Sequence, residues 1–165
     1  MPSSPPTLTI RIKKVPDGPP VLTAVRADGS STWQRSNAAF PVHDLVHYSV
    51  ESALGFRNAF LGLLAQGWEL TDFGRPWPRG ALPEEAVFAE AIVGEVWRCF
   101  LLREPLTAAE LNERVAAHRK EHGLPLLRTV TEGELSTAVA RLGELAMRWR
   151  SLPVGGTLEL PFPPG

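Results

Sequence analysis

Apolar and polar residues alternate at both ends of the chain, and this period of two constrains the fold more than any other feature of the sequence. Residues 8–13 (LTIRIK) and 157–162 (TLELPF) each place every second side chain on one face, as a half-buried strand does. Such a strand needs a neighbour for its backbone and a cover for its apolar face. We therefore expect the two ends to join in one sheet, although most of the chain lies between them.

Two more strands are expected directly after the first. The run 16–20 (PDGPP) has strong turn chemistry, and Asp28-Gly29 is a hairpin signal between residues 21–25 and 31–34. Connections this short favour antiparallel neighbours. Pro161 suits an edge or the end of a strand. The expected strands lie near residues 7–14, 21–27, 31–35 and 157–162.

Between these strands the apolar residues follow a helical period. A helix is expected from Val42 to a stop at Gly55, and a second, short one over residues 56–65. Residues 68–82 are rich in Gly, Pro and Arg and are expected to form a loop.

Three further helices follow from their start signals. Pro83 precedes two glutamates that suit the first turn of a helix running to about Leu102. Thr107 and Thr131 each precede a glutamate by three residues, which is the capping-box pattern. The helix over 84–102 is apolar nearly all round, so we expect it to be the most buried helix.

These elements predict an α+β fold in which an antiparallel sheet of three to four strands has four to five helices packed on one face. The length of 165 residues suits one domain, and we find no internal repeat and no long linker. We therefore predict a single domain over residues 1–165, with residues 1–6 flexible.

Composition excludes several classes of function. The net charge is −1, from 17 basic and 18 acidic residues, so no basic surplus indicates a nucleic acid or a membrane surface as partner. The lone Cys99 cannot form an internal disulfide, and the N-terminus lacks the pattern of a secretory signal. We expect a cytoplasmic protein that does not enter a membrane. Self-association and a protein partner stay open.

The most suggestive motif for chemistry lies in the first expected helix. His43 and His47 are four residues apart, a spacing at which two imidazoles share a helix face and can hold one metal ion. Glu51 continues the same stripe but lies about 12 Å along the axis from His43, which makes it a poor third ligand for the same ion. In the structural alternative, these side chains hydrogen-bond within the fold, and Asp44 complements the helix dipole in the first turn.

The string His43-Asp44-x-x-His47 is similar to motifs of HD-type phosphohydrolases and of a zinc-motif family of ubiquinone biosynthesis. The first family needs an upstream histidine, and His43 is the first in this chain. The second needs a glutamate where this chain has Ala59. Residues 41–67 and 149–153 resemble uncharacterised bacterial proteins that carry an H-D-L-V-H helix. That resemblance implies a bacterial source and no known activity.

Glu95 is our candidate for the missing third metal ligand. It lies between apolar positions of the helix 84–102, and a buried carboxylate needs a partner or a metal. The alternative is a local ion pair with Arg98, three residues on. Cys99 is expected to be a small core residue rather than a nucleophile. His118 and His122 match an inverted zinc-protease string, but at the charged end of a short helix we expect them to be open to solvent.

Two functional hypotheses remain, and the sequence leaves open whether the protein is an enzyme. In the first, His43, His47 and Glu95 bind a divalent metal such as zinc, and Asp44 or Glu51 acts as the base in hydrolase-like chemistry. In the second, the chain is a non-catalytic interaction or structural module whose sheet edge or exposed aromatic side chains contact another protein or a second copy. Ligands converging on a pocket favour the first hypothesis, and water-facing histidines favour the second.

Overall fold

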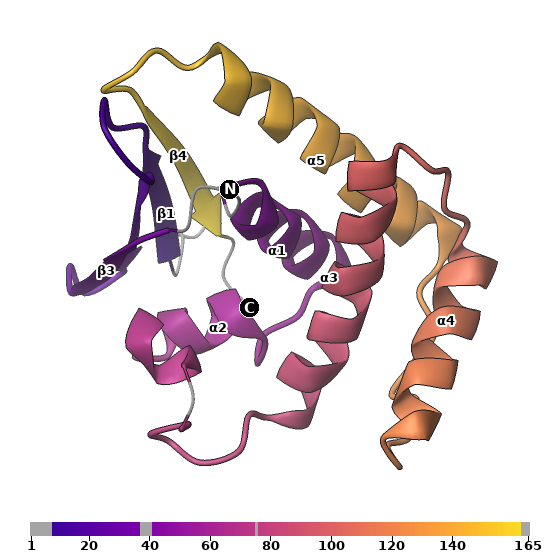
Figure 1. Cartoon of the computed structure of the whole chain (residues 1–165). Coiled ribbons are helices and arrows are strands. Elements are labelled where there is room, and N and C mark those ends of the chain that lie inside the picture. Colours follow the sequence, from indigo (N-terminus) through magenta and orange to yellow (C-terminus); the bar gives the residue numbers. More distant parts are fainter. Residues whose placement is uncertain (1–7, 37–40, 75, 163–165) are drawn as a thin grey trace, which may run out of the picture.

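In the computed structural model, which describes residues 8–36, 41–74 and 76–162, helices pack on one face of an antiparallel sheet (Figure 1). The expectation for residues 1–6 lies outside the described residues. The described elements, in chain order, are β1 (Leu8–Lys13), β2 (Val21–Arg26), β3 (Ser31–Arg35), α1 (Pro41–Leu54), α2 (Phe60–Ala65), the 3-10 helix η1 (Leu70–Phe73), α3 (Glu84–Leu102), α4 (Ala108–Glu121), α5 (Glu132–Ser151) and β4 (Thr157–Phe162).

The sheet confirms that the two ends of the chain join. Its order is β3-β2-β1-β4, and β1 pairs antiparallel with β4, so that Leu8 faces Phe162 and Ile12 faces Leu158. These four side chains are buried beneath the helices. On the opposite face of the same two strands, Arg11 and Glu159 form an exposed ion pair at 2.8 Å. The alternation in sequence therefore separates the covered face from the open one.

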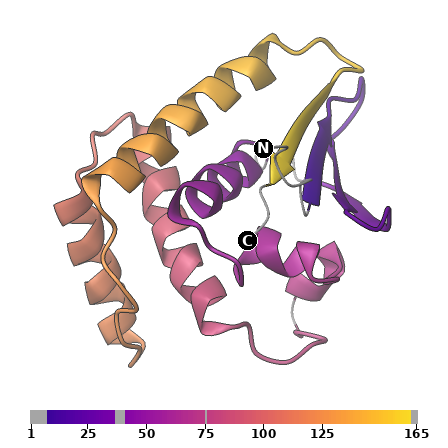
Figure 2. The same ribbon diagram turned by 180° about the vertical axis from the view of Figure 1, so that it is seen from behind.

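The helices form layers beyond the sheet. Two opposite views show α1 next to the sheet, then α3, then α4, with α5 running alongside α1 and passing the end of α3 (Figures 1 and 2). The predicted helix 84–102 has the predicted bounds, and both predicted capping boxes are present, at Thr107 and Thr131. Among the described helices, none is long and apolar enough to cross a membrane.

The expected helix over 56–65 begins later, at Phe60. The reason is a carboxylate from the start of α3: Glu85 Oε1 accepts the backbone N–H groups of Arg57 at 2.6 Å and Asn58 at 2.7 Å. These two residues therefore bind the first turn of α3 instead of starting their own helix.

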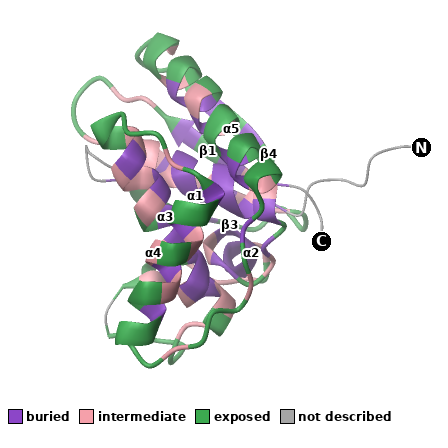
Figure 3. Ribbon diagram, turned by 90° about the vertical axis from the view of Figure 1, so that its right-hand side faces the viewer, coloured by how far each residue is buried: buried purple, intermediate pink, exposed green. Residues whose placement is uncertain are grey.

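The expectation that α3 is the most buried helix is wrong. Seven of its 19 residues are buried, against eight of 14 in α1. The helix α1 lies between the sheet, α3 and α5, whereas the last turn of α3 extends past its neighbours and leaves Leu101 and Leu102 at 57% and 58% exposure. Figure 3 shows how the buried residues gather around α1, while the outer side of α5 is exposed. The apolar surface of α3 is thus only partly used in the core.

The substitution Ile92→Ala tests whether the middle of α3 is packed in the core while its last turn is exposed. Ile92 is 1% exposed, so Ile92→Ala should lower the free energy of unfolding by about 2–5 kcal/mol, measured by urea denaturation. Leu101→Ala, on the exposed last turn of the same helix, is the control and should cost less than about 1 kcal/mol. Equal losses for the two variants would contradict the described packing.

Candidate functional site

The helix α1 brings His47 and Glu51 together, because residues four positions apart are neighbours on the surface of a helix. His47 Nδ1 lies 3.0 Å from Glu51 Oε1, and its other ring nitrogen, Nε2, lies 3.4 Å from Glu90 Oε1 on α3. The His47 side chain is 5% exposed and packs against Phe60 with ring centroids 5.0 Å apart. Both nitrogens of this buried imidazole therefore face carboxylates.

Glu51 connects α1 to α2. Its side chain is 0% exposed, and its second oxygen, Oε2, accepts the backbone N–H of Leu61 at 2.8 Å. That N–H lies in the first turn of α2, where amide donors have no partner within the helix. Both oxygens of Glu51 are thus engaged in holding the fold together.

The charge states of this pair follow from opposing effects. Burial alone would lower the pKa of His47, but the hydrogen bond to Glu51 and the negative charges of Glu90, Glu51 and Asp44 raise it. For Glu51, burial raises the pKa, against the hydrogen bond and charge of His47 and the N–H of Leu61. The acidic groups around the buried imidazole therefore favour its protonated form more than water does.

His43 lies one turn before His47 and is partly buried. Its ring packs edge-on against His47, with centroids 4.9 Å apart, and against Trp97 of α3, at 5.8 Å. Burial lowers the pKa of His43 to about 4, and the positive charge of His47 acts in the same direction. His43 is therefore neutral at pH 7.

Asp44 lies in the first turn of α1, as predicted. Burial raises the pKa of Asp44 to about 6, against the charge of His47 and a hydrogen bond that Ser36 Oγ donates at 3.3 Å. A carboxyl group with this pKa exchanges a proton near neutral pH, as a general base must.

The predicted third ligand does not join this group. Glu95 Oε2 lies 3.4 Å from Arg98 and 3.3 Å from Arg114, so the ion-pair alternative describes it. Among residues 8–36, 41–74 and 76–162, no group of three or more His, Cys, Asp or Glu side chains has the geometry to hold a metal ion. The structure places His43 and His47 together and brings Glu90, rather than Glu95, to them.

The other singled-out residues lie elsewhere. Cys99 is buried at 4% exposure, as predicted for a core residue, with Arg98 and Arg114 nitrogens 3.5 and 3.6 Å from its sulfur. His118 and His122 are exposed at the end of α4, as expected, with ring centroids 4.5 Å apart.

Sequence reasoning missed Glu90. On its own helix Glu90 is an ordinary surface residue, with a half-exposed side chain, and nothing in its sequence neighbourhood marks it. Its role depends on how α1 packs against α3, which a local pattern does not contain.

No family model, curated protein or solved structure matches this chain. The resemblance to proteins that carry an H-D-L-V-H helix therefore stays a prediction from the residues, and the site must be judged by its own geometry.

The lowered pKa of His43 predicts an acid-dependent contribution to stability. Folding holds the neutral imidazole, whereas the unfolded chain takes up a proton below its ordinary pKa of 6.5. His43 therefore costs no stability above that value and costs progressively more down to about pH 4, at about 1.4 kcal/mol per pH unit. Relative to His43→Gln, the wild-type protein should lose unfolding free energy between pH 7 and pH 4, by less than about 3 kcal/mol because solvent screens the charge of this partly exposed ring.

The measurement is a series of urea denaturation curves at half-unit steps of pH. His118→Gln, which removes an exposed histidine from α4, is the matched control and should follow the wild-type profile. Parallel profiles for wild type and His43→Gln would show that burial of His43 does not disfavour its charge.

Proposed function

We propose that this protein is a non-catalytic interaction module that pairs with a second copy of itself through the edge strand β3. The observation that carries the proposal is Trp33, which lies in the middle of β3 and is 65% exposed. A large aromatic side chain left in water on an edge strand is costly for a monomer and is typical of a binding surface.

The two edges of the sheet differ in a way that supports this choice. The strand β4 forms one edge and carries Pro161, which has no backbone N–H to offer a further strand. The strand β3 forms the other edge and contains no proline and a single charged residue, Arg35. Of the two, β3 is the edge that can add a strand.

Symmetric pairing of two β3 strands suits their sequence. An antiparallel pair centred on Trp33 places Trp33 opposite its copy and Arg35 opposite Ser31. Aromatic cross-strand pairs are favourable, and no like charges meet in this register. The net charge of −1 also leaves little long-range repulsion between two copies.

The polar residues of α1 support a non-catalytic module. Both His47 and Glu51 are buried, and their nitrogen and oxygen atoms are used in contacts between α1, α2 and α3. Groups engaged in this way hold the fold and are not presented to a substrate.

Sedimentation equilibrium over a range of protein concentrations tests the proposal. The wild-type protein should dimerise, and Trp33→Lys should weaken the dimer at least tenfold by placing two cations opposite each other. Met147→Lys is the matched control, because Met147 is equally exposed, at 66%, but lies on α5. A wild-type protein that stays monomeric at millimolar concentration, or equal weakening by both variants, would refute pairing through β3.

A second candidate function, metal-dependent hydrolase-like chemistry, is favoured by one distance. Two ligands of a tetrahedral zinc ion lie about 3.3 Å apart, which is close to the 3.4 Å between His47 Nε2 and Glu90 Oε1. A carboxylate on the other imidazole nitrogen, here Glu51, is the usual partner of a metal-bound histidine. Among the described residues no third side chain completes this pair, so His47 and Glu90 would hold the ion as two ligands. Asp44 would be the base, and a bound zinc ion would supply an activated water.

Metal titration of tag-free protein tests this second candidate. Zinc, manganese or nickel at about 100 times the dissociation constant should add roughly 2.7 kcal/mol to the unfolding free energy, seen as a rise in melting temperature. The effect should grow with pH, since the raised pKa of His47 makes protons compete with the metal. Glu90→Gln should abolish it and Glu95→Gln, on the same helix, should not. Unchanged melting temperatures with all three metals would exclude the site.

A further inference from the structure

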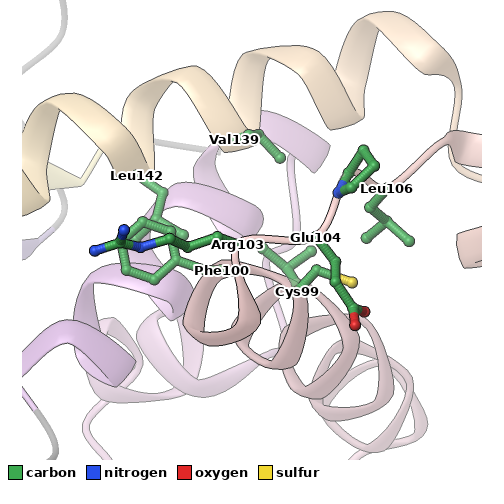
Figure 4. A pocket seen from close by; sticks show the side chains of 9 residues that line it. Cys99, Phe100, Arg103, Glu104, Leu106, Val139 and Leu142 are labelled. Atoms are coloured by element: carbon green, nitrogen blue, oxygen red, sulfur yellow. The ribbon is translucent and has the colours of Figure 1, made fainter.

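A cavity of about 290 Å³ lies where the end of α3, the start of the α3–α4 connection and the middle of α5 meet. Its walls are mostly apolar, from Val96, Phe100, Leu106, Val139 and Leu142, and Arg103 and Glu104 are the charged residues of the lining (Figure 4). It lies apart from the residues of α1 and from β3, so an inference about it is independent of the proposed function.

We propose that this cavity binds a small amphiphilic carboxylate, with its apolar tail inside and its carboxylate on Arg103. An engineered apolar cavity of roughly 150 Å³ holds a benzene molecule. A volume of about 290 Å³ therefore has room for a medium-length acyl chain. Val139 is 44% exposed at the wall of the cavity, and a bound tail would cover it.

The charge at the rim selects an anion. Arg103 lines the cavity, and within the described part of the chain its guanidinium forms no ion pair or hydrogen bond. Glu104, the acidic residue of the lining, is bound to Arg98 at 3.0 Å. In Figure 4 the side chains of Arg103 and Glu104 point away from each other, so the guanidinium of Arg103 is separated from the carboxylate of Glu104. A planar guanidinium with free donors is suited to a carboxylate.

The backbone at Arg103 is a second, independent indication. Arg103 ends α3 in the left-handed conformation with φ 56°, and it is the only described residue other than glycine with a positive φ. Glycine is the residue usually found at this place in a helix terminus. A long cationic side chain therefore occupies a position where glycine would fold with less strain, and it does so at the rim of the cavity.

The test is isothermal titration calorimetry with octanoate, octanol and octylammonium as probes, all below their micellar concentrations. Octanoate should bind at least tenfold more tightly than octanol, and octylammonium more weakly than either. The near-UV spectrum provides a second readout, because Trp97 stacks on the cavity residue Phe100 with centroids 6.5 Å apart.

Three variants assign the contacts, and the first of them is expected to keep the stability of the fold. Arg103→Gly should be at least as stable as wild type, because glycine favours φ 56°, and it should bind octanoate no better than octanol. Arg103→Lys keeps the charge and should retain the preference for octanoate. Val139→Phe fills the cavity from its exposed wall and should abolish binding of all three probes.

Three results would overturn the proposal. They are equal affinity of wild-type protein for octanoate and octanol, wild-type octanoate affinity in Arg103→Gly, and no binding of any probe at millimolar concentration. A cavity that takes apolar molecules regardless of charge would give the first result.

Discussion

The buried pair of His47 and Glu51 is the interaction on which the arrangement of the helices depends. A carboxylate with 0% exposure is tolerated only when its oxygens have partners. Glu51 obtains one from its own helix and one from the first turn of α2, while His47 reaches Glu90 on α3. The orientation of α1 is therefore set against both neighbours, since a rotation of α1 would leave an unpaired charge in the core.

The pairing of β1 with β4 determines where the two surfaces that we propose for binding lie. Because the last strand returns to the first, all the helices are inserted between β3 and β4 in sequence, and β3 is left at the edge of the sheet. The same insertion lays α5 across the end of α3, and the cavity lies where they meet. The surfaces that we propose for binding are thus the places where the architecture leaves a strand edge and a helix end incompletely covered.

Charged residues illustrate where local patterns stop being informative. The end of α4 has the charged sequence of an open helix terminus, and its histidines are exposed as that sequence predicts. Arg119 lies between them and is 1% exposed, with its guanidinium 5.3 Å from the ring of Phe88 and 3.1 Å from Glu84. Glu90 and Glu95 are a second example. Both are glutamates of α3, but Glu90 lies beside His47 whereas Glu95 forms an ion pair with Arg114, and the sequence around them does not distinguish the two.

The sequence by itself determined the elements and their class. Alternation predicted β1 and β4 and their joining, the capping boxes predicted the starts of α4 and α5, and the spacing of His43 and His47 predicted that their rings share a helix face, because all of these depend on a repeat or on residues within one turn. Only the tertiary structure decided that α1 is more buried than α3, that Glu90 completes the surroundings of His47, and that Arg103 lies at the rim of a cavity. Each of these depends on which faces of separate helices meet, and that is set by the packing of the whole chain rather than by any segment of it.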